Sequence, residues 1–232
     1  MFNWKVIEDI VGPITEKQKK QLVDYKNLIQ EENKKYNLTT IVLDEEIFWK
    51  HFYDSIIFSQ DFKLSNQFIL DIGTGAGFPG IVIKVLFPET IVTLVESNNK
   101  KIAFLNLVIK KLELNNITTS SQRAEQFSID NKEKYDIVIS RALAQLNILL
   151  ELGVQALKIN GHFICLKSKN AGTELSELNG KECAIGLKLV KQQNLEIDQL
   201  GERVNLFFEK VRSTSIDYPR PYPQIKKKPL GK

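Results

Sequence analysis

One stretch of this chain constrains its fold more than any other: residues 70–80, which read LDIGTGAGFPG. A short apolar run, residues 67–72, leads into the stretch, and a second one, residues 79–87, begins at its end with a proline, a residue tolerated in the first turn of a helix. Glycine adopts backbone conformations that other residues avoid, and it lets a ligand approach the main chain without meeting a Cβ atom. A glycine-rich turn between a buried strand and a helix is typical of Rossmann-like nucleotide-binding folds. The stretch therefore predicts an α/β protein with a ligand at this turn.

The rest of the chain continues the alternation of strand and helix patterns. Strands are predicted at 67–72, 90–95, 117–121, 135–140 and 162–167, and helices at 79–87, 98–112 and 143–157. A turn at Asn160-Gly161 is predicted to separate the last helix from the fifth strand. The alternation indicates a mostly parallel, doubly wound sheet with helices on both faces. A polar helix at 173–183 follows, and then two strands, 188–197 and 203–211, predict an antiparallel closing hairpin.

The first 62 residues contain helix patterns and no clear strand. Thr15 and Gln18 form a capping box that predicts a helix over residues 15–36, and Asp44 begins a second helix with one apolar face. We therefore expect three parts: a helical N-terminal extension packed on the core (1–62), a Rossmann-like core (63–213) and a basic C-terminal tail (214–232).

Composition excludes several classes of protein. No apolar run is long enough to cross a bilayer, and the N-terminus does not resemble a signal peptide. The two cysteines, Cys165 and Cys183, form no C-x-x-C pair, so we expect neither disulfides nor a metal site. These features predict a soluble, cytoplasmic protein that binds no membrane, and nothing in the sequence demands more than a monomer.

The chain is mildly basic, with a formal net charge of +4. Residues 219–232 contain no acidic residue, and their basic residues are Arg220, Lys226, Lys227, Lys228 and Lys232. Such a segment can neutralise phosphates and release counterions on binding nucleic acid. The alternative is a basic terminus that is merely solvated.

The cofactor predicted for the glycine-rich turn is S-adenosylmethionine. Gly75 and Gly77 also fit the G-x-G-x-x-G pattern of dinucleotide sites, but Asp71 would repel a pyrophosphate, and Pro79 removes an amide that a phosphate needs. Asp71 is expected to receive the amino group of the cofactor through water. Glu96, which ends the second strand, is expected to accept the ribose hydroxyls, and Glu125, after the third strand, to accept the adenine amino group. A dinucleotide site and a purely structural turn remain as alternatives.

Several segments together resemble the ribosomal RNA small-subunit methyltransferase G family, also called glucose-inhibited division protein B. They are LDIGTGAGFPGIVIKVLFP (70–88), QRAE (122–125), YDIVISRA (135–142), YPRPYPQIKKKPL (218–230), YNLTT (36–40) and WKHFYDS (49–55). The resemblance implies a class I Rossmann-like methyltransferase that methylates N7 of one guanine in 16S ribosomal RNA, with that RNA or the small ribosomal subunit as its partner. It also implies cofactor contacts, at Gly73, Phe78, Ala124, Glu125 and Arg141.

The residues agree with chemistry that needs no acid or base. Guanine N7 is nucleophilic at neutral pH, so its methylation can depend on positioning and electrostatics. Arg141 is predicted to position the acceptor or, alternatively, to pair with an acidic neighbour; His51 and Lys167 are weaker candidates beside it. A buried structural role is the alternative for His51, which lies on an apolar helical face.

RNA contacts are predicted at Arg123, Arg220, Lys226, Lys227 and Lys228. Three other functions stay open at this point: a small-molecule methyltransferase, a nicotinamide-dependent oxidoreductase, and a non-enzymatic RNA-binding module with a vestigial cofactor site.

Overall fold

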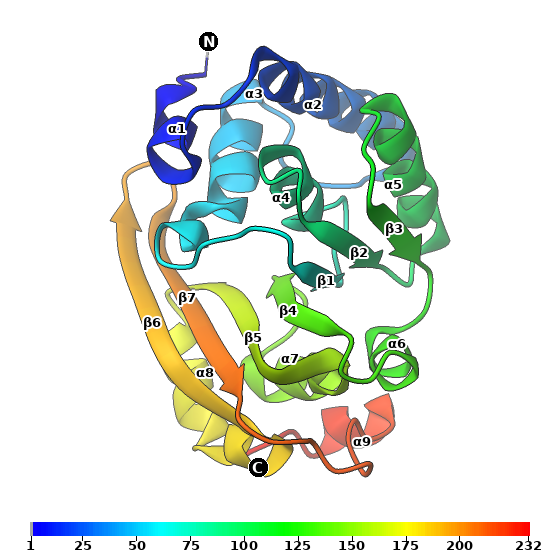
Figure 1. The fold of residues 1–232 in the computed structure, drawn as a ribbon, viewed down its shortest axis with the longest axis vertical. Coiled ribbons are helices and arrows are strands. Elements are labelled where there is room, and N and C mark those ends of the chain that lie inside the picture. The colour runs from blue at the N-terminus through cyan, green and yellow to red at the C-terminus, as the bar shows by residue number, and fades with distance from the viewer. Residues whose placement is uncertain (1) are drawn as a thin grey trace.

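A seven-stranded sheet forms the centre of the computed structural model, which describes residues 2–232 (Figure 1). The strand order is β3-β2-β1-β4-β5-β7-β6. The strands are β1 (Phe68–Ile72), β2 (Ile91–Val95), β3 (Ile117–Ser120), β4 (Tyr135–Arg141), β5 (Leu157–Ser168), β6 (Leu187–Ile197) and β7 (Gly201–Lys210). Strands β1 to β5 pair in parallel, and β7 pairs antiparallel with both β5 and β6. The predicted mostly parallel sheet with an antiparallel closing hairpin is confirmed.

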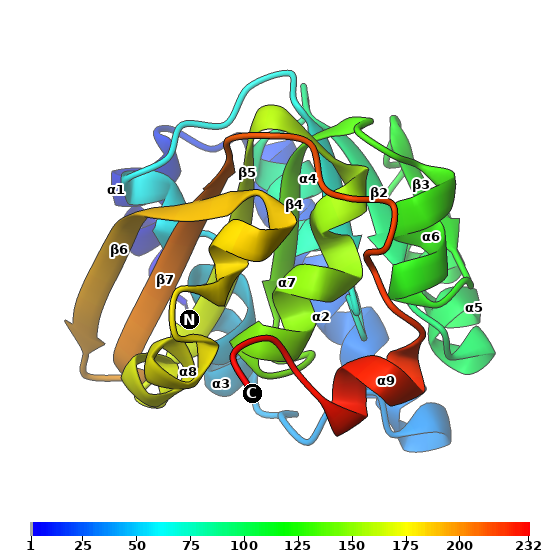
Figure 2. The same cartoon turned by 90° about the horizontal axis from the view of Figure 1, so that it is seen from below.

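Helices cover both faces of the sheet, as Figures 1 and 2 show. One face carries α1 (Lys5–Val11), α2 (Glu16–Tyr36), α3 (Asp44–Ile47), α4 (Gly80–Leu86) and α5 (Asn99–Lys111). The other face carries α6 (Ala124–Asp130), α7 (Leu146–Gly153), α8 (Ala171–Leu178) and α9 (Tyr222–Lys227). The buried apolar residues accordingly form two clusters, one on each side of the sheet. Within residues 2–232, no helix combines the length and the apolar character that a membrane span needs.

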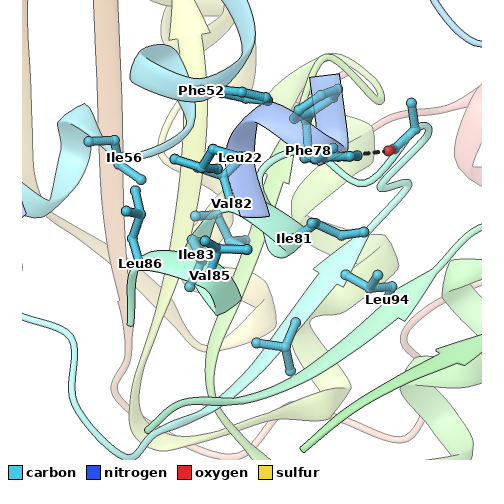
Figure 3. Close-up of a cluster of buried hydrophobic side chains, with 14 of the residues drawn as sticks. Leu22, Phe52, Ile56, Phe78, Ile81, Val82, Ile83, Val85, Leu86 and Leu94 are labelled. Atoms are coloured by element: carbon cyan, nitrogen blue, oxygen red, sulfur yellow. Dashed lines mark hydrogen bonds between the residues drawn. The ribbon is translucent and has the colours of Figure 1, made fainter. Parts of the chain in front are cut away.

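The N-terminal segment shares the core of the sheet. Figure 3 shows Leu22 of α2 and Phe52 and Ile56 of the following turns in one cluster with Val82 and Leu86 of α4. The predicted capping box at Thr15 is present, and Gln18 also donates a hydrogen bond to the carbonyl of Val85 (3.0 Å). Contacts of this kind cross the boundary expected at residue 62, and the division into three parts stays a prediction.

Two local predictions are wrong. Asn160-Gly161 does not separate a helix from a strand but lies inside β5, next to a shift in the pairing of β5 with β4. Asn160 has a left-handed φ of 65°, which asparagine tolerates, so the pair forms an irregularity in the strand. The helix expected over 173–183 ends at Leu178, because Asn179 and Gly180 are both left-handed; a 3₁₀ turn, Lys181–Ile185, follows. Helices α1, α6 and α9 were not predicted from the sequence.

Candidate active site

The glycine-rich turn connects β1 to α4, and hydrogen bonds to the buried Asp71 carboxylate fix its conformation. This carboxylate is fully buried, and its Oδ2 accepts hydrogen bonds from the Thr74 hydroxyl (2.6 Å) and the Gly80 amide (2.8 Å). Burial raises the pKa of Asp71 to about 7. Its Oδ1 is buried without a hydrogen-bond partner among the described residues. Asp71 thus fixes the conformation of the turn through Oδ2. Its contact with a cofactor through water stays a prediction, and the unpaired Oδ1 is the atom that could make it.

Three glycines give the turn its path. Gly73, Gly75 and Gly77 have φ values of 67°, 62° and 105°, all in the region that other residues rarely adopt. A Cβ atom on Gly73 would also collide with the Leu143 side chain, and one on Gly77 would lie 2.6 Å from the Tyr25 hydroxyl. The turn therefore needs glycine both for its backbone and for its neighbours.

A small cavity of about 210 Å³ lies beside the turn, and we call it the donor cavity. Gly73, Glu96, Arg123, Ala124 and Glu125 line it, as do Leu143, Ala144 and Tyr222. It joins the ends of β1 and β2 to the start of α6. The predicted cofactor residues Gly73, Glu96, Ala124 and Glu125 thus come together at one cavity, whereas Asp71, Gly75, Gly77, Phe78 and Arg141 do not line it.

The carboxylates of the donor cavity suit an adenosine group. Glu96 accepts hydrogen bonds from the Gly75 amide (3.1 Å) and the Asn98 amide (2.9 Å), which fix its position at the end of β2. Glu125 lies in the first turn of α6 and pairs with Arg123, with 2.5 Å between Oε1 and Nε. A carboxylate at each end can accept the hydroxyls of a ribose and the amino group of an adenine. The residues present therefore fit S-adenosylmethionine.

A larger cavity of about 540 Å³, which we call the acceptor cavity, lies next to the donor cavity, and Leu143 and Ala144 line both. Its titratable lining residues are Lys50, His51, Asp54, Arg141, Lys167, Glu174 and Arg203. They come from the N-terminal segment, the ends of β4 and β5, the start of β7 and α8. Within residues 2–232, no cluster of three or more His, Cys, Asp or Glu side chains is arranged to hold a metal ion.

Arg141, the last residue of β4, is the centre of the acceptor cavity's polar network. Its guanidinium donates hydrogen bonds to the Lys50 carbonyl (2.9 Å) and to Asp54 (3.2 Å), and it lies 5.1 Å from the ring centre of Phe78. Arg203 contacts the other oxygen of Asp54 (2.6 Å). Arg141 therefore pairs with an acidic neighbour, Asp54, which was the alternative predicted for it, and it also lines the acceptor cavity.

His51 is buried and packed against Phe78, with 4.3 Å between ring centres. Its Nδ1 lies 3.1 Å from the Arg141 guanidinium, which donates, and 3.2 Å from the Lys50 carbonyl, which accepts, and its Nε2 lies 3.1 Å from the Thr39 hydroxyl. Burial, together with the charge of Arg141, lowers the pKa of His51 to about 3. His51 is thus a neutral side chain in the wall of the acceptor cavity. It is buried, as the structural alternative predicted, and it also lies at the predicted acceptor site.

The weaker candidate, Lys167, is held at the rim of the acceptor cavity. Its ammonium contacts Glu174 (2.7 Å) and donates to the Ala144 carbonyl (2.7 Å). The same oxygen of Glu174 accepts a hydrogen bond from the Leu146 amide (2.8 Å), at the start of α7. Lys167 therefore also fixes the segment that separates the two cavities.

The predicted RNA-binding residues fall into two groups. Lys226, Lys227 and Lys228 are exposed, and the Arg123 side chain is 56% exposed although it pairs with Glu125. Arg220 instead bonds both oxygens of the fully buried Glu151 (2.8 and 2.6 Å). Because this pair engages its guanidinium, Arg220 anchors the C-terminal segment, and nothing in the structure supports its predicted RNA contact.

Sequence reasoning missed Arg203, Leu143 and Tyr222. Arg203 lies in a segment without a recognisable motif, and Tyr222 lies in the 218–230 segment, for which only RNA contacts were predicted; both reach the cavities through long-range packing. Leu143 follows Ala142, which has a left-handed φ of 56°. Its position directly after the SRA string at the end of β4 was the one signal that could have identified it.

Comparison with known proteins agrees with this geometry. Residues 18–202 match the model of a family described as rRNA small subunit methyltransferase G. Ribosomal RNA small subunit methyltransferase G of Mesoplasma florum is 49% identical over 98% of this chain and 97% of its own length. The protein of the same name from Clostridium botulinum strain 657 is 42% identical over 96% and 95%.

Solved structures share the fold. M. jannaschii TYW2 in complex with AdoMet superposes with a TM-score of 0.55 at 16% identity, over 74% of this chain and 79% of that one. A SAM-dependent methyltransferase from Aquifex aeolicus also gives 0.55, at 14% identity over 72% and 94%.

Proposed function

This chain belongs to the rRNA small subunit methyltransferase G family, and from that premise we propose that it methylates N7 of one guanine in the 16S RNA of the small ribosomal subunit. Membership makes it an S-adenosylmethionine-dependent methyltransferase, rather than a nicotinamide-dependent oxidoreductase. The observation that carries the proposal is that the donor and acceptor cavities are neighbours, with Leu143 and Ala144 in the lining of both.

The donor cavity would hold the cofactor by its polar ends. Glu96 would accept the ribose hydroxyls and Glu125 the adenine amino group, while Gly73 and Ala124 leave room for the ligand. Asp71, Gly75, Gly77 and Phe78 do not line this cavity and would support it by shaping the turn, and Asp71 would in addition reach the cofactor through water from its free Oδ1. When bound, S-adenosylmethionine supplies an electrophilic methyl group on its sulfonium.

The acceptor cavity supplies orientation rather than proton transfer. N7 of guanine needs no deprotonation before it attacks a methyl group, so the enzyme has to align the base and exclude competing geometries. His51 is neutral and both its ring nitrogens are engaged, which leaves it no role as an acid or base. Arg141 and Lys167 lie on the cavity wall, where their remaining donors can face guanine O6 or a phosphate.

Exposed Lys226, Lys227 and Lys228, with Arg123, would contact the RNA backbone. We infer that the protein works as a monomer, because one chain contains both cavities. We also infer that it acts in the cytoplasm, where its proposed substrate is made.

The test is methyl transfer from labelled S-adenosylmethionine to small subunits that lack the modification, with the methylated nucleotide mapped by mass spectrometry. We expect label in 16S RNA at N7 of a single guanine. Label in small metabolites alone would favour the small-molecule alternative, and label at another base atom would refute the N7 assignment. Calorimetry with S-adenosylhomocysteine distinguishes the methyltransferase from a non-enzymatic RNA-binding module. The module has no working cofactor site, so the titration would release no heat.

A further inference from the structure

The C-terminal helix α9 reaches the donor cavity through its first residue, Tyr222. This side chain lines the cavity together with Arg123 and Glu125, although α9 lies beyond the last strand of the sheet. The guanidinium of Arg123 lies 4.6 Å from the centre of the Tyr222 ring. The same guanidinium pairs with Glu125. Tyr222, Arg123 and Glu125 thus form a continuous row of contacts along one wall of the cavity.

The position of α9 is fixed by buried contacts. Arg220 is anchored on Glu151 of α7, and its backbone amide also donates to that carboxylate (2.8 Å). Ile225 is fully buried, and the Leu230 amide donates to the Asn147 carbonyl of α7 (3.1 Å). Because Glu151 is completely buried, breaking its pair with Arg220 would leave an uncompensated charge in the core. These contacts fix the backbone of α9 on both sides of Tyr222, and with it the position from which the Tyr222 side chain lines the cavity.

We propose that Tyr222 is a positioning residue of the donor site. Its ring supports the Arg123 guanidinium, which orients the Glu125 carboxylate toward the adenine amino group of the cofactor. This inference rests on the proposed assignment of the donor cavity to S-adenosylmethionine. It makes the C-terminal segment part of the cofactor site, whereas the sequence indicated either an RNA-binding tail or a solvated basic terminus.

The row of contacts predicts a loss of base discrimination when the ring is removed. Glu125 can accept a hydrogen bond from the amino group of adenine but not from the oxygen that replaces it in hypoxanthine. In a Tyr222→Leu protein, S-adenosylhomocysteine should bind about two- to fivefold more weakly, the range expected for losing an exposed cation–π contact. S-inosylhomocysteine, which carries hypoxanthine in place of adenine, should lose less affinity. The ratio of the affinity for S-adenosylhomocysteine to that for S-inosylhomocysteine should therefore fall. Tyr222→Phe keeps the ring face and should preserve the ratio.

Titration calorimetry with both ligands tests this, and Tyr218→Leu is the matched control. Tyr218 lies in the same segment, with the Arg220 guanidinium 5.8 Å from its ring centre, and it lines neither cavity. Should Tyr222→Leu fail to fold, Arg123→Gln removes the middle of the row from an exposed position and should lower the ratio in the same way.

An unchanged ratio in folded Tyr222→Leu or Arg123→Gln would overturn the inference. Glu125→Gln distinguishes that failure from a wrong cavity assignment. If Glu125→Gln lowers the ratio while the other two variants do not, only the role of Tyr222 is wrong. If Glu125→Gln also leaves the ratio unchanged, the adenine does not lie at Glu125, and the assignment of the donor cavity fails with it.

Discussion

At the scale of single residues, neighbours give the same residue type different roles. Gly73 and Gly180 have nearly equal φ values, 67° and 70°, but a Cβ on Gly73 would strike Leu143 whereas one on Gly180 would meet nothing within 4 Å. Backbone conformation alone therefore explains Gly180, and Gly73 also keeps space open at the donor cavity.

Replacing Gly73 with alanine should weaken S-adenosylhomocysteine binding about tenfold or more, since the new methyl group would displace Leu143 into the cavity. Gly180→Ala is the control for backbone strain. Gly180→Ala should lose about 1–2 kcal/mol of stability, the cost of a left-handed L-residue, and Gly73→Ala should lose more, because its methyl group also collides with Leu143; only Gly73→Ala should lose affinity. Thermal unfolding and calorimetry measure the two effects. Equal affinity in both variants would remove Gly73 from the site.

Buried His51 predicts a pH-dependent stability. Its pKa is about 3 in the folded protein against 6.5 for the free side chain, so its contribution is complete above pH 6.5 and is lost as the pH falls toward 3. His51→Gln removes this dependence. The stability difference between wild type and variant should therefore shift in favour of the variant, by about 1.5 kcal/mol, between pH 6.5 and 5. Urea unfolding at several pH values measures it; Asp71 is present in both proteins and cancels. A difference that does not change with pH would contradict the neutral state.

At the scale of elements, the sequence pattern predicted all seven strands. The parallel strands β1, β2 and β4 stand out as short, mostly apolar runs, whereas β6 and β7 were predicted as a closing hairpin. The periodicity failed where a local irregularity resembled a turn, as at Asn160-Gly161. It also failed for α9, because a six-residue helix with one buried residue, Ile225, among prolines and lysines shows no apolar period. Site residues that lie within sequence motifs, such as Gly73, Glu125 and Arg141, could be predicted from the sequence. The pairing of Asp54 with Arg203 depends on tertiary packing, which local patterns do not encode.

Helix α2 holds the glycine-rich turn from outside the sheet. The buried hydroxyl of Tyr25 donates to the Ala76 carbonyl (2.6 Å), and its ring stacks on Phe52. Tyr25→Phe would leave that carbonyl buried and unpaired, so stability should fall by about 1–3 kcal/mol and S-adenosylhomocysteine should bind more weakly.

Tyr135→Phe is the matched control, since it removes a hydroxyl that contacts Thr93 (3.1 Å), away from the turn. It should lower stability without changing affinity. Denaturant unfolding and calorimetry give both quantities. A Tyr25→Phe protein with unaltered affinity would show that α2 supports only the fold.

At the scale of the whole molecule, α9 and the exposed lysines lie on the sheet face opposite α2 and α5 (Figures 1 and 2). Changing Lys226, Lys227 and Lys228 to glutamine should weaken RNA binding and reduce its dependence on salt, by about 2 in the slope of log K against log salt if all three contact phosphates. Filter binding at several salt concentrations measures this slope.

The matched control carries the same charge change on the other face, at Lys17, Lys110 and Lys111, which are also exposed. We expect its slope to stay close to that of the wild type. Equal losses in the two triple variants would mean that net charge, rather than this surface, determines RNA affinity.

A crystal structure of the protein with S-adenosylhomocysteine shows whether the donor cavity holds the methyl donor with its sulfur directed toward the acceptor cavity. We expect the ribose on Glu96, the adenine at Ala124 and Glu125, and the sulfur beside Leu143. Ligand density elsewhere, or a ligand in this cavity with its sulfur turned away from Arg141, would overturn the assignment of the two cavities.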